Sequence, residues 1–262
     1  MRPAPKTLMP VVAVVVALVL LAVAVVLFLA PRTRDAAPGA DEASRPSWAP
    51  PAGSPPRTMN PFDGVSVVTL VDPTWLDETA KATGIPRRAL AAYAGATVVK
   101  EDHRPDCHLD WTTLAAIGAV ESDHGRHGGS TVNDAGDVEP PIYGRDLDGE
   151  GVALIPDSDG GEIDEDAEGD RAVGPMQFIP ESWRNWHVDG NADGVQDPQN
   201  IDDAVMAAGN YLCRASSAFD TEEGWRAGVM AYNSDPDYVG TVAAYAVRFA
   251  EAAAASATTP SP

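Results

Sequence analysis

The chain has 262 residues, with 39 aspartates and glutamates against 18 lysines and arginines, and its formal net charge at pH 7 is −21. All 39 acidic residues but only 14 of the basic ones follow position 34, so the chain beyond that point carries a charge of −25. This sign is wrong for binding nucleic-acid phosphates or an anionic membrane surface. It suits a secreted domain, a cation-binding domain, or one that engages neutral or cationic polymers. The length allows one sizeable domain or two small ones.

The N-terminal region predicts a membrane anchor. Residues 9–30 contain no charge over 22 positions, which is long enough to span a bilayer. A cleaved signal peptide is the alternative, but no clean small-x-small cleavage site follows directly. Residues 1–8 are then a short cytoplasmic N-terminus. Residues 31–60, rich in Pro, Ala and Ser, are expected to be a disordered linker or stalk.

Helix signals dominate from residue 72 onward. Asp72 followed by Pro73 predicts an N-cap with proline at the first helical position, and Gly84 ends that helix. Further helices are expected after Pro86, after Asp110, from Pro180, from Ile201, over 224–233 and over 236–252. Strand signals are weak and limited to short runs such as VSVVTLV at 65–71. The domain over 61–252 is expected to be mostly α-helical, with a long Gly- and Asp-rich insertion over about 125–173 and a disordered tail over 253–262.

The two cysteines, Cys107 and Cys213, do not have the spacing of a metal site. Two buried free thiols are one interpretation. A single disulfide is favoured if the domain lies outside the cytoplasm.

The stretch AAIGAVESDHGRHGG, residues 115–129, ends an apolar helical run on a glutamate. On a helix capped by Asp110, Leu114, Ile117, Gly118 and Glu121 share one face. The apolar stripe and the nearby helix C-terminus both raise the pKa expected for Glu121, as a general acid requires near neutral pH. The competing interpretation is a local ion pair of Glu121 with His124, Arg126 or His127.

Two later motifs each allow a structural and a functional interpretation. DRAVGPMQFIPESW, residues 170–183, is either a loop with a helix start or a cleft wall in which Gln177 makes hydrogen bonds. AYNSDPDY, residues 231–238, is either a turn between helices or a sugar-binding junction with two tyrosines and an asparagine.

Four motifs in order carry a resemblance to a known family. AAIGAVESDHG, AVGPMQFIPESW, DGNADGVQDP and AYNSDPDYV follow one another as in lytic transglycosylases of the membrane-bound B type, which are lysozyme-like enzymes that cleave peptidoglycan. The chain resembles an actinobacterial-like version of this family over roughly residues 70–250.

The resemblance implies a lysozyme-like α-helical fold and a set of site residues. Glu121 corresponds to the family's catalytic glutamate, which protonates the glycosidic oxygen between N-acetylmuramic acid and N-acetylglucosamine and then accepts the proton of the muramyl 6-hydroxyl. One carboxylate then suffices where ordinary glycosidases use two. The residues implied in glycan binding are Gln177, Tyr232, Asn233, Tyr238, Met176 and Phe178, with Gly174 and Pro175 shaping the same wall.

The acidic insertion DLDGEGVALIPDSDGGEIDEDAEGD departs from this pattern. It could supply a second aspartate near the cleft and so allow hydrolysis. Otherwise its acidic run over 157–170 is expected to be a solvated loop.

The stretch DGNADGVQDPQN, residues 189–200, matches the start of an EF-hand loop. Asp189, Asn191 and Asp193 occupy positions 1, 3 and 5, and the Val195 carbonyl occupies position 7. Position 12 is asparagine, so Asp203 is the candidate for the last ligand. The sequence favours a structural Ca²⁺ site over a metal-free Asx-rich turn, and no other cofactor is expected.

The resulting hypothesis is a single-pass membrane protein with its catalytic domain on the extracytoplasmic, cell-wall side. Its expected partners are peptidoglycan glycan strands and, through residues 9–30, the membrane; no nucleic acid is expected. The expected reaction is non-hydrolytic cleavage that leaves a 1,6-anhydromuramyl end. A hydrolytic muramidase and a non-catalytic peptidoglycan-binding module are the alternatives.

Overall fold

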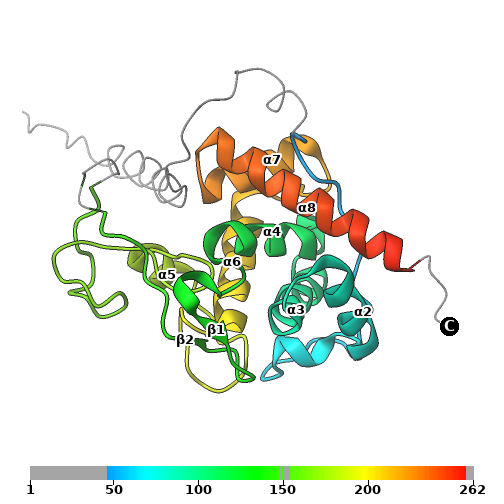
Figure 1. Ribbon diagram of the computed structural model, residues 1–262, viewed down its shortest axis with the longest axis horizontal. Helices are drawn as coiled ribbons and strands as arrows, with labels where there is room; N and C mark the ends of the chain where they lie inside the picture. The colour runs from blue at the N-terminus through cyan, green and yellow to red at the C-terminus, as the bar shows by residue number, and fades with distance from the viewer. Residues whose placement is uncertain (1–45, 148, 150–153, 258–262) are drawn as a thin grey trace, which may run out of the picture.

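The computed structural model describes residues 46–147, 149 and 154–257 (Figure 1). Helices dominate this part of the chain, as the sequence predicts. The α-helices are α2 (Pro73–Thr83), α3 (Arg87–His103), α4 (Trp111–Ser122), α5 (Pro180–Trp186), α6 (Ile201–Ala215), α7 (Glu222–Tyr232) and α8 (Pro236–Ala257). Short 3-10 turns are η2 (Val67–Leu70), η3 (Pro105–Cys107) and η4 (His127–Gly129), and strands β1 (Thr131–Val132) and β2 (Val138–Glu139) form one antiparallel pair.

Most helix boundaries follow local signals in the sequence. The carboxylate of Asp72 accepts a 2.9 Å hydrogen bond from the Trp75 amide, and Gly84 ends α2 with φ at 75°. Asp110 caps α4 by accepting the Thr112 amide at 2.9 Å. Because these caps act over two or three residues, they are readable without knowing the fold.

The expected membrane anchor over 9–30 and residues 31–45 of the expected linker lie outside the described residues. Within the ranges given above, the structure holds no helix that combines the length and the apolar character needed to cross a bilayer.

Three expectations need correction. Residues 65–71 do not form a strand, because Val67–Leu70 form the 3-10 turn η2. Val67 and Leu70 are both buried, and side chains three positions apart lie on the same side of a 3-10 turn. The tail does not begin at 253, because the alanine-rich α8 continues to Ala257 and Ala253 packs against the core. Residues 46–60 do not form a free linker but lie on the domain, where Ala49 is buried.

Helix α4 lies at the centre of the domain (Figure 1). It packs against α8 and α3, and it also contacts α6. Nearly all its side chains are buried, including Trp111, Leu114 and Ile117. A helix that is apolar on every side needs partners all round, so α4 provides a rigid support for the residue at its end.

The disulfide predicted between Cys107 and Cys213 is present, with its Cα atoms 5.4 Å apart. It joins η3, which precedes α4, to α6 across 106 positions of sequence. The free-thiol interpretation is therefore wrong.

The insertion after α4 is folded rather than simply solvated. Asp164 and Asp170 are fully buried, in contrast to the expected solvated acidic loop. Asp170 accepts hydrogen bonds from the backbone and hydroxyl groups of Ser158, at 2.8 and 2.7 Å. Asp164 accepts the Arg171 amide at 2.8 Å. Short acidic side chains bond readily to nearby backbone groups, so an aspartate-rich segment can organise itself through its own turns.

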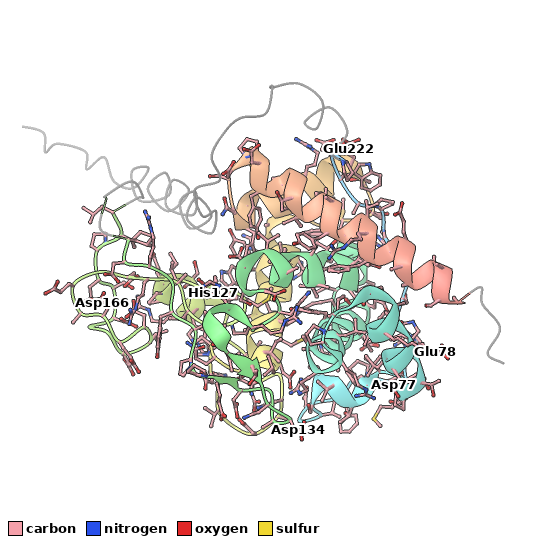
Figure 2. The ribbon with its side chains drawn as sticks, in the orientation of Figure 1. Asp77, Glu78, His127, Asp134, Asp166 and Glu222 are labelled. Atoms are coloured by element: carbon pink, nitrogen blue, oxygen red, sulfur yellow. A yellow bond between two sulfur atoms is a disulfide. The ribbon has the colours of Figure 1, made fainter. Side chains whose placement is uncertain are left out.

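Other acidic residues lie at the outside of the domain. Asp77, Glu78, Asp134, Asp166 and Glu222 are distributed around its outline in Figure 2, and they come from α2, the β hairpin, the insertion and α7. The negative charge is therefore spread over several faces.

Candidate functional site

Glu121 occupies the last turn of α4 and is 7% exposed. The hydroxyl of Tyr238, in the first turn of α8, donates a 2.6 Å hydrogen bond to Oε1 of Glu121. Oε2 of Glu121 makes no hydrogen bond with the described residues. One carboxyl oxygen is thus fixed by a hydroxyl from a different helix.

Burial raises the pKa of Glu121 from 4.5 to about 7, although the hydrogen bond from Tyr238 lowers it. The shift follows because a charged carboxylate loses its water shell in this environment. A carboxyl group with this pKa holds a proton near neutral pH and can release it, which is the property required of a general acid. Burial and the negative charge of Glu121 raise the pKa values of Tyr232 and Tyr238, so both hydroxyls keep their protons.

Glu121 does not form the local ion pair that sequence reasoning offered as the alternative. Arg126 instead pairs with Asp123, with 2.7 Å between Nη2 and Oδ1. The buried His124 has its Nδ1 atom 3.2 Å from the Tyr93 hydroxyl. Burial lowers the pKa of His124 to about 4, so the ring is neutral and supplies no charge to Glu121.

The backbone turns sharply directly after Glu121 and Ser122. Asp123 and His124 both have positive φ, at 52° and 61°, and Gly125 follows at 81°. Two consecutive non-glycine residues in the left-handed region are uncommon and strained, and such strain is often found at functional sites. The hydroxyl of Ser122 holds the turn, because it accepts the Gly125 amide at 2.8 Å and donates to the Pro175 carbonyl at 2.7 Å.

Gly118 lies one turn before Glu121 on α4. The space that a side chain at this position would fill is occupied by the Tyr93 side chain. A Cβ atom on Gly118 would lie 2.1 Å from the Tyr93 hydroxyl oxygen. The absent side chain therefore lets Tyr93 reach His124 behind the helix end. The sequence gives no signal for the contact roles of Tyr93 and Ser122, and it suggested His124 only as an ion-pair partner of Glu121.

The two later motifs meet beside Glu121. The Tyr232 hydroxyl, at the end of α7, donates a 2.7 Å hydrogen bond to the Met176 carbonyl. The rings of Tyr232 and Phe178 are edge to face with centroids 6.0 Å apart. Met176 is fully buried, and both it and Phe178 belong to the core. These two residues therefore shape the site from behind.

Gln177 is half-buried with φ at 49°, and its Nε2 donates to the Gly174 carbonyl at 2.9 Å. This bond leaves the side-chain oxygen Oε1 of Gln177 close to Gly144. A Cβ atom added to Gly144 would lie 3.1 Å from that oxygen. Asn233 is buried, and its Oδ1 accepts the Asp235 amide at 3.0 Å. Asn233 thus shapes the turn into α8, on which Tyr238 approaches Glu121.

The loop over 189–203 has part of an EF-hand arrangement. Oδ2 of Asp189 accepts the Gly194 amide at 2.9 Å, and Oδ1 of Asp193 accepts the Val195 amide at 2.7 Å. Asp203 accepts the amides of Gly190 and Asp197 at 2.6 and 2.8 Å. The loop is therefore closed by hydrogen bonds between its carboxylates and its own backbone.

The donor set fits a calcium ion in part. The side chains of Asp189, Asn191 and Asp193 offer oxygens from one loop, as Ca²⁺ prefers, and an oxygen that accepts one hydrogen bond retains a second lone pair. Burial and, to a smaller extent, the repulsion from the charge of Asp189 raise the pKa of Asp203 to about 6, against the lowering effect of its backbone hydrogen bonds. A cation would relieve that repulsion. However, Asn200 at position 12 is committed to capping α6 through the Asp202 amide.

Carboxylate oxygens of Asp157, Asp159 and Asp170 in the insertion lie within 4.8 Å of one another. Asp170 already has its oxygens bonded to Ser158, and Asp157 and Asp159 accept nearby loop amides. This arrangement is accounted for by the folding of the loop.

Comparison with protein families gives one partial match. Residues 169–255 match the family described as transglycosylase SLT domain. The match contains Gln177, Tyr232, Asn233 and Tyr238, whereas Glu121 and α4 precede it. No curated protein and no solved structure matches the chain. The match over 169–255 supports a lytic transglycosylase-like family for this chain.

Proposed function

We propose that the protein is a peptidoglycan lytic transglycosylase that cleaves the β-1,4 bond between N-acetylmuramic acid and N-acetylglucosamine. The observation that carries this proposal is the buried Glu121, whose pKa is raised to about 7 and whose Oε1 is held by Tyr238. The family match over 169–255 supports peptidoglycan as the substrate class, and it contains Tyr238, which bonds to Glu121.

In the proposed reaction, the proton on Glu121 moves to the glycosidic oxygen while the bond from that oxygen to the muramyl C1 atom breaks. The N-acetylglucosamine end leaves with a free hydroxyl group. The Glu121 carboxylate then takes the proton of the muramyl 6-hydroxyl, whose oxygen attacks C1 and closes the 1,6-anhydro ring. Glu121 ends protonated, and no water is consumed.

The surroundings of Glu121 suit both halves of this cycle. Burial favours the neutral acid that begins the reaction, and the Tyr238 hydroxyl stabilises the carboxylate that forms in the middle of it. The Glu121 pKa is set by burial and by Tyr238, with no contribution from another carboxylate among the described residues. A single carboxyl that gives up and takes back one proton is what the transglycosylase reaction requires.

The test is to incubate the full chain with purified peptidoglycan and to identify the products by mass spectrometry. Muropeptides one water lighter than the hydrolysed forms are expected from the wild type and not from Glu121→Gln. This variant keeps the shape of the side chain and an oxygen that accepts from Tyr238, but it has no proton to transfer.

The other outcomes would identify the alternatives. Products with a reducing end would assign a hydrolytic muramidase. If the protein forms no product but sediments with peptidoglycan, a non-catalytic binding module is the correct description.

We further propose that residues 9–30 anchor the protein in the membrane, with the catalytic domain on the extracytoplasmic side. The disulfide between Cys107 and Cys213 supports this location, because such bonds persist in oxidising compartments. Both cysteines are buried, so alkylation after denaturing lysis of cells, with and without prior reduction, tests this placement. Labelling without prior reduction would argue for a cytoplasmic domain.

We also propose a structural Ca²⁺ site in the loop that contains Asp189, Asn191 and Asp193, with the Val195 carbonyl as a further ligand. Asp203 would complete it only by giving up part of its bonding to backbone amides. The ion would stabilise the loop that leads into α6 and takes no part in the proposed proton transfers.

A further inference from the structure

The described chain begins with a segment, residues 46–60, that we name the N-terminal strap. It runs across the starts of α7, α4 and α2. It contains no helix or strand, and its only ladder contact is a single bridge between Arg57 and Val71. Its composition predicts a free linker, yet specific hydrogen bonds hold it at each of the three helices.

At α7 the strap bonds through Ser47. The Ser47 hydroxyl donates to Oε1 of Glu222 at 2.8 Å, and the guanidinium of Arg226 donates to the Ser47 carbonyl at 2.9 Å. Next along the strap, Ala49 is 2% exposed and Trp48 packs against the core. This end is therefore held by packing as well as by polar contacts.

At α4 the strap bonds to the N-cap residue. The amides of Ala52 and Gly53 donate to Oδ2 of Asp110, at 3.1 and 3.2 Å. Oδ1 of the same carboxylate accepts the amide and hydroxyl of Thr112, at 2.9 and 2.6 Å. Asp110 is 6% exposed, so its two oxygens depend on these donors in place of water.

At α2 the strap bonds to the backbone around Asp72. The Asp72 amide donates to the Pro56 carbonyl at 2.9 Å, and the Thr58 amide donates to the Leu70 carbonyl at 2.8 Å. These bonds resemble a short stretch of sheet pairing and fix the far end of the strap.

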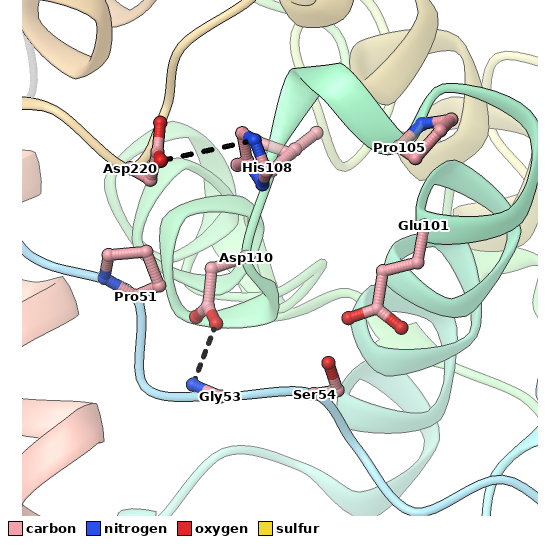
Figure 3. Close-up of a pocket in the computed structure, with 9 residues that line it drawn as sticks. Pro51, Gly53, Ser54, Glu101, Pro105, His108, Asp110 and Asp220 are labelled. Carbon is pink, nitrogen blue, oxygen red and sulfur yellow. Dashed lines mark hydrogen bonds and ion pairs between the residues drawn. The ribbon is translucent and has the colours of Figure 1, made fainter.

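Between these two ends the strap runs between two hollows. A cavity of about 250 Å³ on one side is lined by Pro51, Gly53 and Ser54 together with Glu101 and His108 (Figure 3). A second cavity, of about 440 Å³, lies between the strap, Trp75, Trp111 and the end of α8. Few side chains therefore pack against residues 52–54, and the hydrogen bonds to Asp110 hold this part of the strap on the domain.

We infer that the N-terminal strap is an integral part of the domain and that Asp110 is a positioning residue, through which the strap holds the start of the helix that carries Glu121 in its last turn. Helix α4 is buried along most of its length, so a shift of its first turn is expected to carry through the same helix to its last turn. The attachment of the strap stands independently of the activity, whereas the effect on cleavage rests on the proposed function.

The first test is amide hydrogen exchange, resolved to single residues, on the full chain. In the wild type the amides of Ala52 and Gly53 are expected to be protected. Asp110→Ser retains a hydroxyl that can cap Thr112 but is too short to reach the strap, and exchange at both amides is expected to accelerate by about tenfold or more. Ser47→Ala is the matched control, because it alters the strap without touching Asp110.

A second variant keeps the test decisive if Asp110→Ser does not fold. Asp110→Asn preserves the size of the side chain and the acceptor for Thr112, but its amide group cannot accept the hydrogen bonds of Ala52 and Gly53. The same acceleration is expected. Unprotected Ala52 and Gly53 amides in the wild type, or rates unchanged in these variants, would overturn the attachment.

The positioning role has its own readouts. Both Asp110 variants are expected to accelerate exchange in the last turn of α4 and to lower kcat for peptidoglycan cleavage with KM unchanged. If exchange becomes faster in the strap alone, and exchange at the end of α4 and kcat are unchanged, the strap binds the domain surface without positioning α4. This result would overturn the positioning role. A wild type without cleavage activity would contradict the proposed function, while the exchange at the α4 end would still decide whether the strap positions that helix.

Discussion

Tyr238 and Glu121 are 117 positions apart in sequence, yet the tyrosine hydroxyl lies 2.6 Å from the glutamate carboxylate. The bond joins the first turn of α8 to the last turn of α4, two helices that pack along each other. It acts against burial, because burial favours the neutral acid and the hydrogen bond favours the anion. Together the two effects leave a carboxyl group that can exchange a proton near neutral pH.

Replacing Tyr238 with phenylalanine is expected to change the pH dependence of cleavage. Loss of the hydrogen bond raises the pKa of Glu121 further, so the alkaline fall in kcat/KM moves to higher pH. The value of kcat is expected to fall by about tenfold to a hundredfold, because the intermediate carboxylate loses a donor. A pH–rate profile for the release of anhydromuropeptides measures both effects.

Tyr245→Phe is the matched control for this variant, since Tyr245 lies on the same helix and makes no hydrogen bond to Glu121. Its profile is expected to follow the wild type. An unchanged profile for Tyr238→Phe would show that the hydroxyl does not influence the reacting carboxyl.

Glu121→Gln is expected to stabilise the protein at alkaline pH while it abolishes cleavage. The folded Glu121 keeps its proton up to about pH 7, whereas the unfolded residue loses it near pH 4.5. Between these values the folded state binds more protons, so wild-type stability falls as the pH rises. The variant lacks this loss. The difference between its free energy of unfolding and that of the wild type is therefore expected to grow, in favour of the variant, by on the order of 3 kcal/mol from pH 4 to pH 8.

Urea unfolding of both proteins at the two pH values measures this gain. The exposed Glu78→Gln on α2 controls for the loss of a charge. A constant difference between the Glu121→Gln variant and the wild type at all pH values would contradict the raised pKa.

The helices were readable from the sequence because their signals are local. Asp72, Gly84 and Asp110 act on residues at most a few positions away, and the structure places each at the expected helix end. The pairing of Cys107 with Cys213 was predictable because two cysteines allow only one intramolecular bond, and the structure contains this bond.

The partners of the site residues could not be read in the same way. Glu121 was identified as a buried carboxyl, but its contact with Tyr238 depends on how α8 crosses α4. Gly118 faces Tyr93 for the same reason. The N-terminal strap shows the opposite case: its Pro- and Ala-rich composition lacks an apolar pattern, and its bonds to Asp110 come from the backbone amides of Ala52 and Gly53, which leave no signal in the sequence.

Calcium is expected to raise the melting temperature of the protein if the loop with Asp189 and Asp193 binds the ion. Binding to the folded state alone stabilises it in proportion to the logarithm of the ligand concentration. Asp193→Ala removes the oxygens at loop position 5 and is expected to abolish the response. Thermal unfolding with calcium or with a chelator measures it.

Glu78→Ala serves as the control, because Glu78 is an exposed acidic residue on α2 and does not belong to this loop (Figure 2). A wild-type melting temperature that does not respond to calcium would remove the proposed site.

Reduction of the Cys107–Cys213 bond is expected to destabilise the domain strongly. The bond closes a loop of 106 residues, for which the chain-entropy model gives a stabilisation of up to about 4–5 kcal/mol. The double variant Cys107→Ser with Cys213→Ser is expected to lose a similar amount with or without reductant. Denaturant unfolding of both proteins, with and without reductant, measures this.

The effect on the site follows from where the bond lies. Cys107 precedes Asp110, and its backbone carbonyl accepts the Phe219 amide at 3.0 Å, so the bond also steadies the region where α4 begins. Loss of the bond is therefore expected to increase amide exchange near Asp110 before global unfolding occurs. Equal stability of the oxidised and reduced wild type would show that packing alone holds the two cysteines together, and the loop-closure argument would fail.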